Sequence, residues 1–162
     1  MGDADLLSSV NAYDWLGHGI YFWEDDPRRA YSWAKANSRI EDPYVVGAII
    51  DLGDCLSLMR EDHLGLLAQS YDHLKKIHEL SGTQMPKNSA GKDKLRRELD
   101  CAVINNLHRL TDYTFDSVRG MFVEGNPAYK GAGFKTKNHV QVCVRTPTLI
   151  KGYFRPTQAT FE

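Results

Sequence analysis

The chain has 162 residues, enough for one domain whose core needs no disulfide or metal to hold it. It carries 20 Lys and Arg against 21 Asp and Glu, so the formal net charge of −1 gives no overall attraction to nucleic acid. No apolar run approaches a membrane span, the N-terminus lacks the pattern of a secretory signal, and three widely spaced cysteines form no CxxC pair. We therefore expect a cytoplasmic protein that does not enter a membrane.

The first predicted elements are a strand and a helix. The strand, Leu16–Trp23, opens with two glycines and closes with three aromatic residues. Asp26 followed by Pro27 is typical of a helix start, because Asp caps the first turn and Pro suits the first helical position. Glycines let another group approach the backbone, and aromatic faces give a planar group a surface to stack on. The pattern predicts a site for a planar, polar small molecule beside this strand.

The remaining chain changes from strands to helices and back to strands. Leucines at helical spacing predict two core-packed helices, and valines alternating with Gln141 and Cys143 predict a strand whose valines face the core and whose Gln141 lies on the other face. The predicted elements are strands at 44–51 and 55–59, helices with apolar stripes over 64–77 and 95–110, a polar loop at 81–92, and strands at 121–124, 140–144 and 150–154. This order predicts one α+β domain over 1–162, with a largely antiparallel or split sheet and a helical insertion at about 60–115.

Two blocks of the sequence match one known pattern. Residues 14–55 contain Gly17-His18-Gly19-Ile20-Tyr21-Phe22, a helix with Tyr31 and Trp33, and then the hydrophobic run Val46–Gly53. Residues 120–155 contain Gln141–Val144 and, at matching spacing, Leu149-Ile150 and Gly152–Phe154. Together the blocks resemble the ADP-ribosyltransferase superfamily, which includes the catalytic domains of diphtheria toxin and poly(ADP-ribose) polymerase. The resemblance implies the split sheet of that fold.

The resemblance also implies NAD as the substrate, with the nicotinamide in a cleft beside the Gly-Ile-Tyr-Phe strand. Tyr21 would line one side of the ring and belong to the catalytic set. Tyr31 or Trp33 would stand near the family's stacking tyrosine, and we keep both. The NAD-binding residues implied in this way are His18, Gly19, Tyr21, Tyr31 and Trp33.

The catalytic position departs from the family pattern, because Gln141 stands where the family has Glu. The reaction breaks the bond between nicotinamide and ribose through an oxocarbenium-like state, related to that of glycoside hydrolysis. An amide accepts a hydrogen bond but supplies no negative charge and no base. Losing one aligned electrostatic contact of this kind raises the barrier by about 3–4 kcal/mol. We therefore expect no poly(ADP-ribose) elongation, which leaves single transfer, slow hydrolysis of NAD, or no catalysis.

A second departure is the family's His-Gly-Ser or His-Gly-Thr strand, about thirty residues before the Gly-Ile-Tyr-Phe strand. Sixteen residues precede Gly17 here and show no such strand, so we expect either a longer natural protein or a true loss. Glu124, at a strand end, is a candidate to compensate for the missing carboxylate, and His139 occupies a place that orients the acceptor in some toxin members. We assign both residues to contact with the acceptor. The alternative is that Glu124 is only a charge at a strand end and His139 only a polar residue in a turn.

The leading hypothesis is an NAD-dependent mono-ADP-ribosyltransferase acting on a macromolecular acceptor, either protein or nucleic acid. A bacterial toxin or defence effector, with an antitoxin or regulatory partner, is the setting we expect for it. The alternatives are a catalytically inactive binding module of the same family and an unrelated α+β domain. Metal binding is not expected, because His63, His73 and His78 do not share a helical face. The basic run Lys92–Arg97 reads as a solvated helix face or a contact to a nucleic-acid acceptor.

Overall fold

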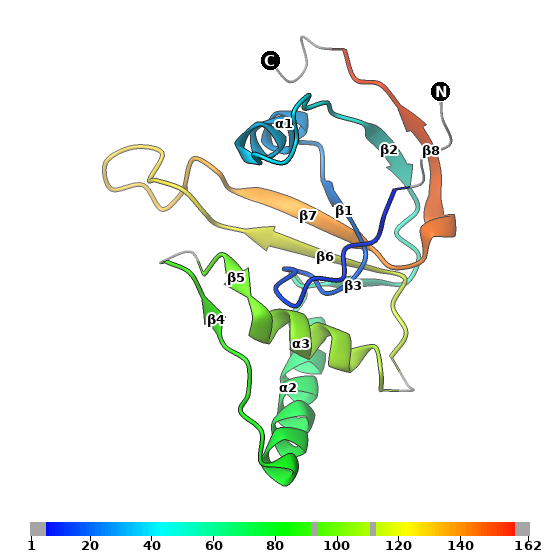
Figure 1. Ribbon diagram of the computed structural model, residues 1–162, viewed down its shortest axis with the longest axis vertical. Helices are drawn as coiled ribbons and strands as arrows, with labels where there is room; N and C mark the ends of the chain where they lie inside the picture. The colour runs from blue at the N-terminus through cyan, green and yellow to red at the C-terminus, as the bar shows by residue number, and fades with distance from the viewer. Residues whose placement is uncertain (1–5, 92–93, 111–112, 158–162) are drawn as a thin grey trace.

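A four-stranded sheet with the strand order β1-β7-β6-β3 forms the centre of the molecule (Figure 1). The computed structural model describes residues 6–91, 94–110 and 113–157. The strands of this sheet are β1 (Ile20–Trp23), β3 (Cys55–Ser57), β6 (Ser117–Phe122) and β7 (His139–Val144). β7 runs antiparallel to both of its neighbours, whereas β3 runs parallel to β6. The α+β class is confirmed. Most strand pairs are antiparallel, as predicted, but the parallel β3–β6 pair makes the central sheet mixed.

The parallel pair arises from the helical middle of the chain. Parallel neighbours need a long crossover connection, and here α2 (Glu61–Ser81) and α3 (Glu98–Leu107) lie within the connection between β3 and β6. The apolar stripes predicted both helices, although α3 begins later than its stripe. The two strands that flank this helical region pair with each other. Lys92 and Asp93, at the start of the basic run, lie outside the described residues.

The remaining strands form two small antiparallel sheets. β2 (Gly47–Ile50) pairs with β8 (Ile150–Phe154), so the ends of the two sequence blocks also meet. β4 (Asn88–Ser89) pairs with β5 (Arg96–Arg97), which places a short strand inside the predicted polar loop. β6 also begins four residues before the predicted strand at 121–124.

The first helix, α1 (Pro27–Ala36), begins as the sequence predicted. The Asp26 side chain accepts a hydrogen bond from the Arg29 backbone N–H at 2.9 Å, and Pro27 occupies the first turn. The helix ends at Ala36, before the predicted end near Arg39. Figure 1 shows α1 above the sheet, near β1, with α2 and α3 at the opposite side. None of the helices in the described residues is long and apolar enough to cross a bilayer.

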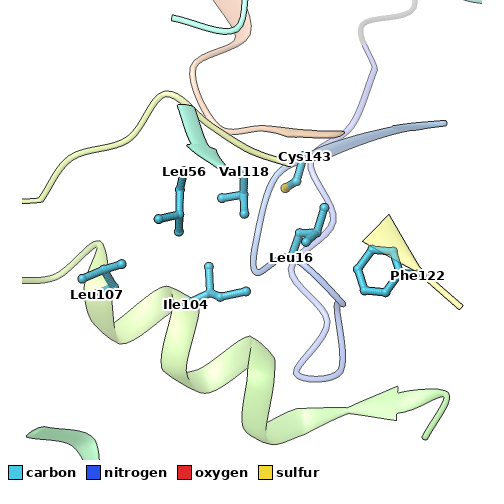
Figure 2. Packing of buried hydrophobic residues seen from close by; sticks show 7 residues of the cluster. All are labelled: Leu16, Leu56, Ile104, Leu107, Val118, Phe122 and Cys143. Atoms are coloured by element: carbon cyan, nitrogen blue, oxygen red, sulfur yellow. The ribbon is translucent and has the colours of Figure 1, made fainter. Parts of the chain in front are cut away.

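The central sheet is covered on both faces. One face packs against α3, where Figure 2 shows Ile104 and Leu107 rising toward the strands. The residues of this cluster are Leu16, Leu56, Ile104, Leu107, Val118, Phe122 and Cys143. On the other face, Val142 and Val144 of β7 pack with Ile50 and Ile150 of the β2–β8 sheet. Cys143 is therefore buried as fully as the valines, so alternation along β7 separates two cores instead of core and solvent.

We expect Gly19→Ala to destabilise the fold. A Cβ at Gly19 would lie 2.6 Å from both Cys143 Sγ and the Val144 carbonyl oxygen, and backbone at that distance cannot yield cheaply. Overpacking of this kind lowers the free energy of unfolding by about 1–3 kcal/mol, as denaturant titration measures.

Gly65→Ala is the matched control for this substitution. Nothing lies within 4 Å of a Cβ at Gly65, which is inside α2, so we expect a gain of about 0.5–1 kcal/mol. Equal stability of wild type and Gly19→Ala would contradict the close approach of the backbones.

Candidate functional site

The pairing of β1 with β7 brings the two sequence blocks together. Tyr21 lies opposite Cys143, and Trp23 lies opposite Gln141. Side chains opposite one another in a ladder share a face of the sheet, so Tyr21, Trp23 and Gln141 lie on the face that α3 covers further along. Two candidate catalytic residues, remote in sequence, are thus placed on adjacent strands.

Tyr21 uses its hydroxyl within the protein. The Tyr21 hydroxyl donates to the Gly17 carbonyl oxygen at 2.7 Å and accepts from the Leu16 backbone N–H at 2.8 Å. Its ring packs against the α3-facing core. Burial is the main reason that the pKa of Tyr21 is raised far above its usual value, with a smaller contribution from Cys143. The phenol therefore holds the turn at Leu16-Gly17 in place.

The glycines before β1 are packed closely by protein atoms. A Cβ at Gly17 would lie 2.9 Å from Asn105 Oδ1, and the space beside Gly19 is taken by β7. His18 is tied by its backbone: its N–H donates to Asn105 Oδ1 at 3.0 Å, and its carbonyl accepts from Arg145 Nη1 at 2.9 Å. The His18 residue also borders a hollow of about 360 Å³ with Arg109. These contacts give both glycines a role in internal packing.

Gln141 and His139 form a hydrogen-bonded pair on β7. His139 Nδ1 lies 2.7 Å from the Lys137 carbonyl, which can only accept, so Nδ1 carries the proton. In the tautomer with the proton on Nδ1, the ring Nε2 accepts from the Gln141 amide Nε2–H, 3.2 Å away. His139 is buried against the rings of Trp15 and Phe122, so its bond to Gln141 holds the amide in place.

α1 joins this end of the sheet through an ion pair and an aromatic contact. Arg29 of α1 forms an ion pair with Glu124, which is buried just after β6. Trp33 contacts Trp23, with ring centroids 5.4 Å apart and planes at 46°. Lys35 Nζ lies 5.3 Å from the centre of the Tyr31 ring. Tyr31 and Trp33 are the two alternatives for the stacking aromatic residue. Of these, Trp33 contacts Trp23, the β1 residue that lies opposite Gln141.

Three buried polar atoms at this end have no hydrogen-bond partner among the described residues: Trp23 Nε1, Arg29 Nε and Asn138 Oδ1. They come from the end of β1, the start of α1 and the residue before β7; the Trp23–Trp33 contact joins β1 to α1, and the Arg29–Glu124 ion pair joins α1 to the end of β6. Buried polar groups are nearly always paired, so unpaired ones mark a place for a polar ligand or ordered water. We call this region, defined by Trp23, Arg29, Trp33, Glu124 and Gln141, the α1 corner.

A hollow of about 520 Å³ lies between the sheet and the helices, and sequence reasoning did not identify it. Trp15, Tyr71 and Phe122 are among its walls, and the Arg97 guanidinium carbon lies 4.6 Å from the Trp15 ring centre and 5.0 Å from that of Phe122. None of the predicted site residues lines it. Trp15 sits inside the first motif block, but a lone tryptophan gives no signal for a wall that α2 and α3 complete.

The described residues contain no group of three or more His, Cys, Asp or Glu side chains placed to hold a metal ion. No protein-family model, curated protein or solved structure matches this chain.

We expect Tyr21→Phe to lower stability, because the loss of the hydroxyl removes the partner of the Leu16 N–H and leaves the Gly17 carbonyl with only the weak S–H donor of Cys143 at 3.7 Å. The expected loss is about 1–3 kcal/mol in the free energy of unfolding at pH 7. The raised pKa of Tyr21 means that only the unfolded chain ionises this group just above pH 10, so wild-type stability should fall there. Tyr21→Phe should lack the part of this decrease in stability that comes from ionisation of Tyr21.

The control is Tyr153→Phe, which removes a hydroxyl from an exposed ring on β8 and should change stability by less than about 0.5 kcal/mol. If Tyr21→Phe were as stable as this control, the Tyr21 hydroxyl would not hold the turn.

Proposed function

We propose that this chain is an ADP-ribosyltransferase-type domain that uses NAD as a substrate and transfers single ADP-ribose units to a macromolecular acceptor. One observation carries the proposal: the two sequence blocks that resemble the superfamily form neighbouring strands, β1 and β7, with Trp23 opposite Gln141. The pairing of β2 with β8 joins the outer parts of the same two blocks. A chance match in sequence would not require either meeting.

The α1 corner is the place that we assign to the nicotinamide end of NAD. Trp33 offers an exposed aromatic face beside Trp23, and it takes the role of the stacking tyrosine in preference to Tyr31. The unpaired N–H groups of Trp23 and Arg29 supply hydrogen-bond donors for a carboxamide or ribose oxygen. In this assignment Tyr21, His18 and Gly19 shape the strand from within, and the ligand contacts come from the residues that follow them.

Gln141 would act on the reacting ribose through its amide oxygen. The hydrogen bond to His139 fixes the amide, so the oxygen can accept from a ribose hydroxyl and orient the sugar. The carbonyl dipole stabilises an oxocarbenium-like carbon less than a carboxylate does. Glu124 does not replace that carboxylate directly, because Arg29 already pairs with it. Turnover is therefore expected to be slow.

A second candidate is a binding module of the same type without catalysis. Gln141 in place of Glu favours it, and so do the Tyr21 hydroxyl and the two glycines, which are engaged by the protein itself. For either candidate we propose a cytoplasmic setting as a bacterial toxin or defence effector, in which an antitoxin or regulatory partner would cover the α1 corner.

The experiment is release of nicotinamide from labelled NAD, with and without cell extract, together with Gln141→Glu. Wild type should release nicotinamide slowly, and the new carboxylate should raise the rate by about 10²–10³-fold, because it restores a charge aimed at the reacting carbon. Label retained on macromolecules from the extract would distinguish transfer from hydrolysis.

Gln69→Glu makes the same chemical change on the exposed surface of α2 and should leave the rate unchanged. Absence of nicotinamide release from both wild type and Gln141→Glu, with both proteins folded, would reject the enzyme and leave the binding module.

A further inference from the structure

The connection between β6 and β7 is an ordered hairpin that displays two aromatic rings. Pro127 pairs with Lys135, and the Ala128 N–H donates to the Phe134 carbonyl at 2.9 Å. A second bond, from the Thr136 N–H to the Asn126 carbonyl at 2.9 Å, closes the base. Tyr129 and Phe134 sit near the tip and are 64% and 69% exposed. Figure 1 shows this hairpin projecting beyond the sheet.

The hairpin, defined as residues 125–138, carries only positive charge. Lys130, Lys135 and Lys137 lie in it, and it contains no Asp or Glu. Aromatic and basic residues therefore alternate on an element that projects into solvent. Exposed apolar side chains that gather on a projecting element mark an interaction surface, and here they have cationic neighbours.

α1 repeats this composition on the adjoining segment. It contains Arg28, Arg29 and Lys35 without an acidic residue, and Trp33 is 46% exposed. The Arg29–Glu124 ion pair ties α1 to the base of the hairpin, because Glu124 directly precedes residue 125. Of the three acidic residues just before α1, Glu24 pairs with Arg119 and Asp26 caps the helix, while Asp25 is exposed.

We propose that the hairpin and α1 form a binding surface for single-stranded nucleic acid. Lysine and arginine attract the phosphates, and Tyr129, Phe134 and Trp33 offer faces on which unpaired bases stack. An acidic protein surface would meet the same charges but would leave the rings without planar partners. Duplexes do not expose their base faces, so single strands fit better.

This surface borders the α1 corner, because Trp33 belongs to both and β7 continues directly from the hairpin to Gln141. A strand held there would present a nucleotide to the proposed site of transfer. That role as the acceptor rests on the proposed function, whereas binding of the strand does not.

The test is fluorescence anisotropy of labelled oligo(U) and oligo(dT), each of about 20 nucleotides, titrated with the full chain at several salt concentrations without NAD. Wild type should bind at low salt and weaken as salt rises. Replacing Tyr129 or Phe134 with Ala should weaken binding about tenfold each, because each ring loses a stacked base. The double variant Lys130→Gln/Lys137→Gln should reduce the salt slope by about 1.4.

The matched controls are Tyr153→Ala, for an exposed ring on β8, and Lys75→Gln/Lys76→Gln, for two exposed lysines on α2; both should bind as wild type does. Dissociation constants above about 10⁻⁴ M for both oligonucleotides at low salt would overturn the proposal. Equal losses of binding in the controls would also overturn it. So would binding of base-free polyphosphate as tightly as the oligonucleotides, if the Ala substitutions at Tyr129 and Phe134 left that binding unchanged. Because no NAD is present, failure here is separate from failure of the transferase assay.

Discussion

The antiparallel pairing of β7 with both β1 and β6 is the constraint on which the rest of the structure depends. Cys143 and Val144 are completely buried on opposite faces of β7, one against the α3 side and one against the β2–β8 sheet. Burying such a side chain contributes about 1.5–3 kcal/mol, and a slip of one residue would exchange the two faces. The register is thereby held, and with it the position of Gln141 opposite Trp23.

The same constraint explains why the residues most conspicuous in the sequence are engaged inside the protein. β7 approaches so closely that no Cβ fits at Gly19, and Tyr21 turns back to bond the chain at Leu16 and Gly17. Buried polar groups without a partner among the described residues occur one step further along, where the sheet ends and α1 begins. They include the N–H groups of Trp23 and Arg29. Gln141, whose amide is bonded to His139, lies opposite Trp23 on β7.

Charge is distributed in a way that the overall composition conceals. A net charge of −1 indicates no attraction to nucleic acid, yet α1 and the hairpin at 125–138 contain six basic residues and no acidic ones. One of the six, Arg29, is neutralised by Glu124, and this pair joins the two segments. Local electrostatics near the α1 corner can thus favour a polyanion, while the rest of the surface keeps the chain close to neutral.

The sequence by itself determined the local elements: Asp26-Pro27 started a helix, apolar stripes predicted α2 and α3, and the run at 150–154 became β8. These signals depend on neighbours a few residues apart, so they are legible in one chain. Only the tertiary structure decided that β3 runs parallel to β6 and that Cys143 belongs to the core on the α3 side of the sheet. It also decided that Trp33 contacts Trp23 and that Arg29 pairs with Glu124. Such contacts join residues up to about a hundred positions apart, and they follow from how both faces of one sheet are covered, which periodicity within a segment does not encode.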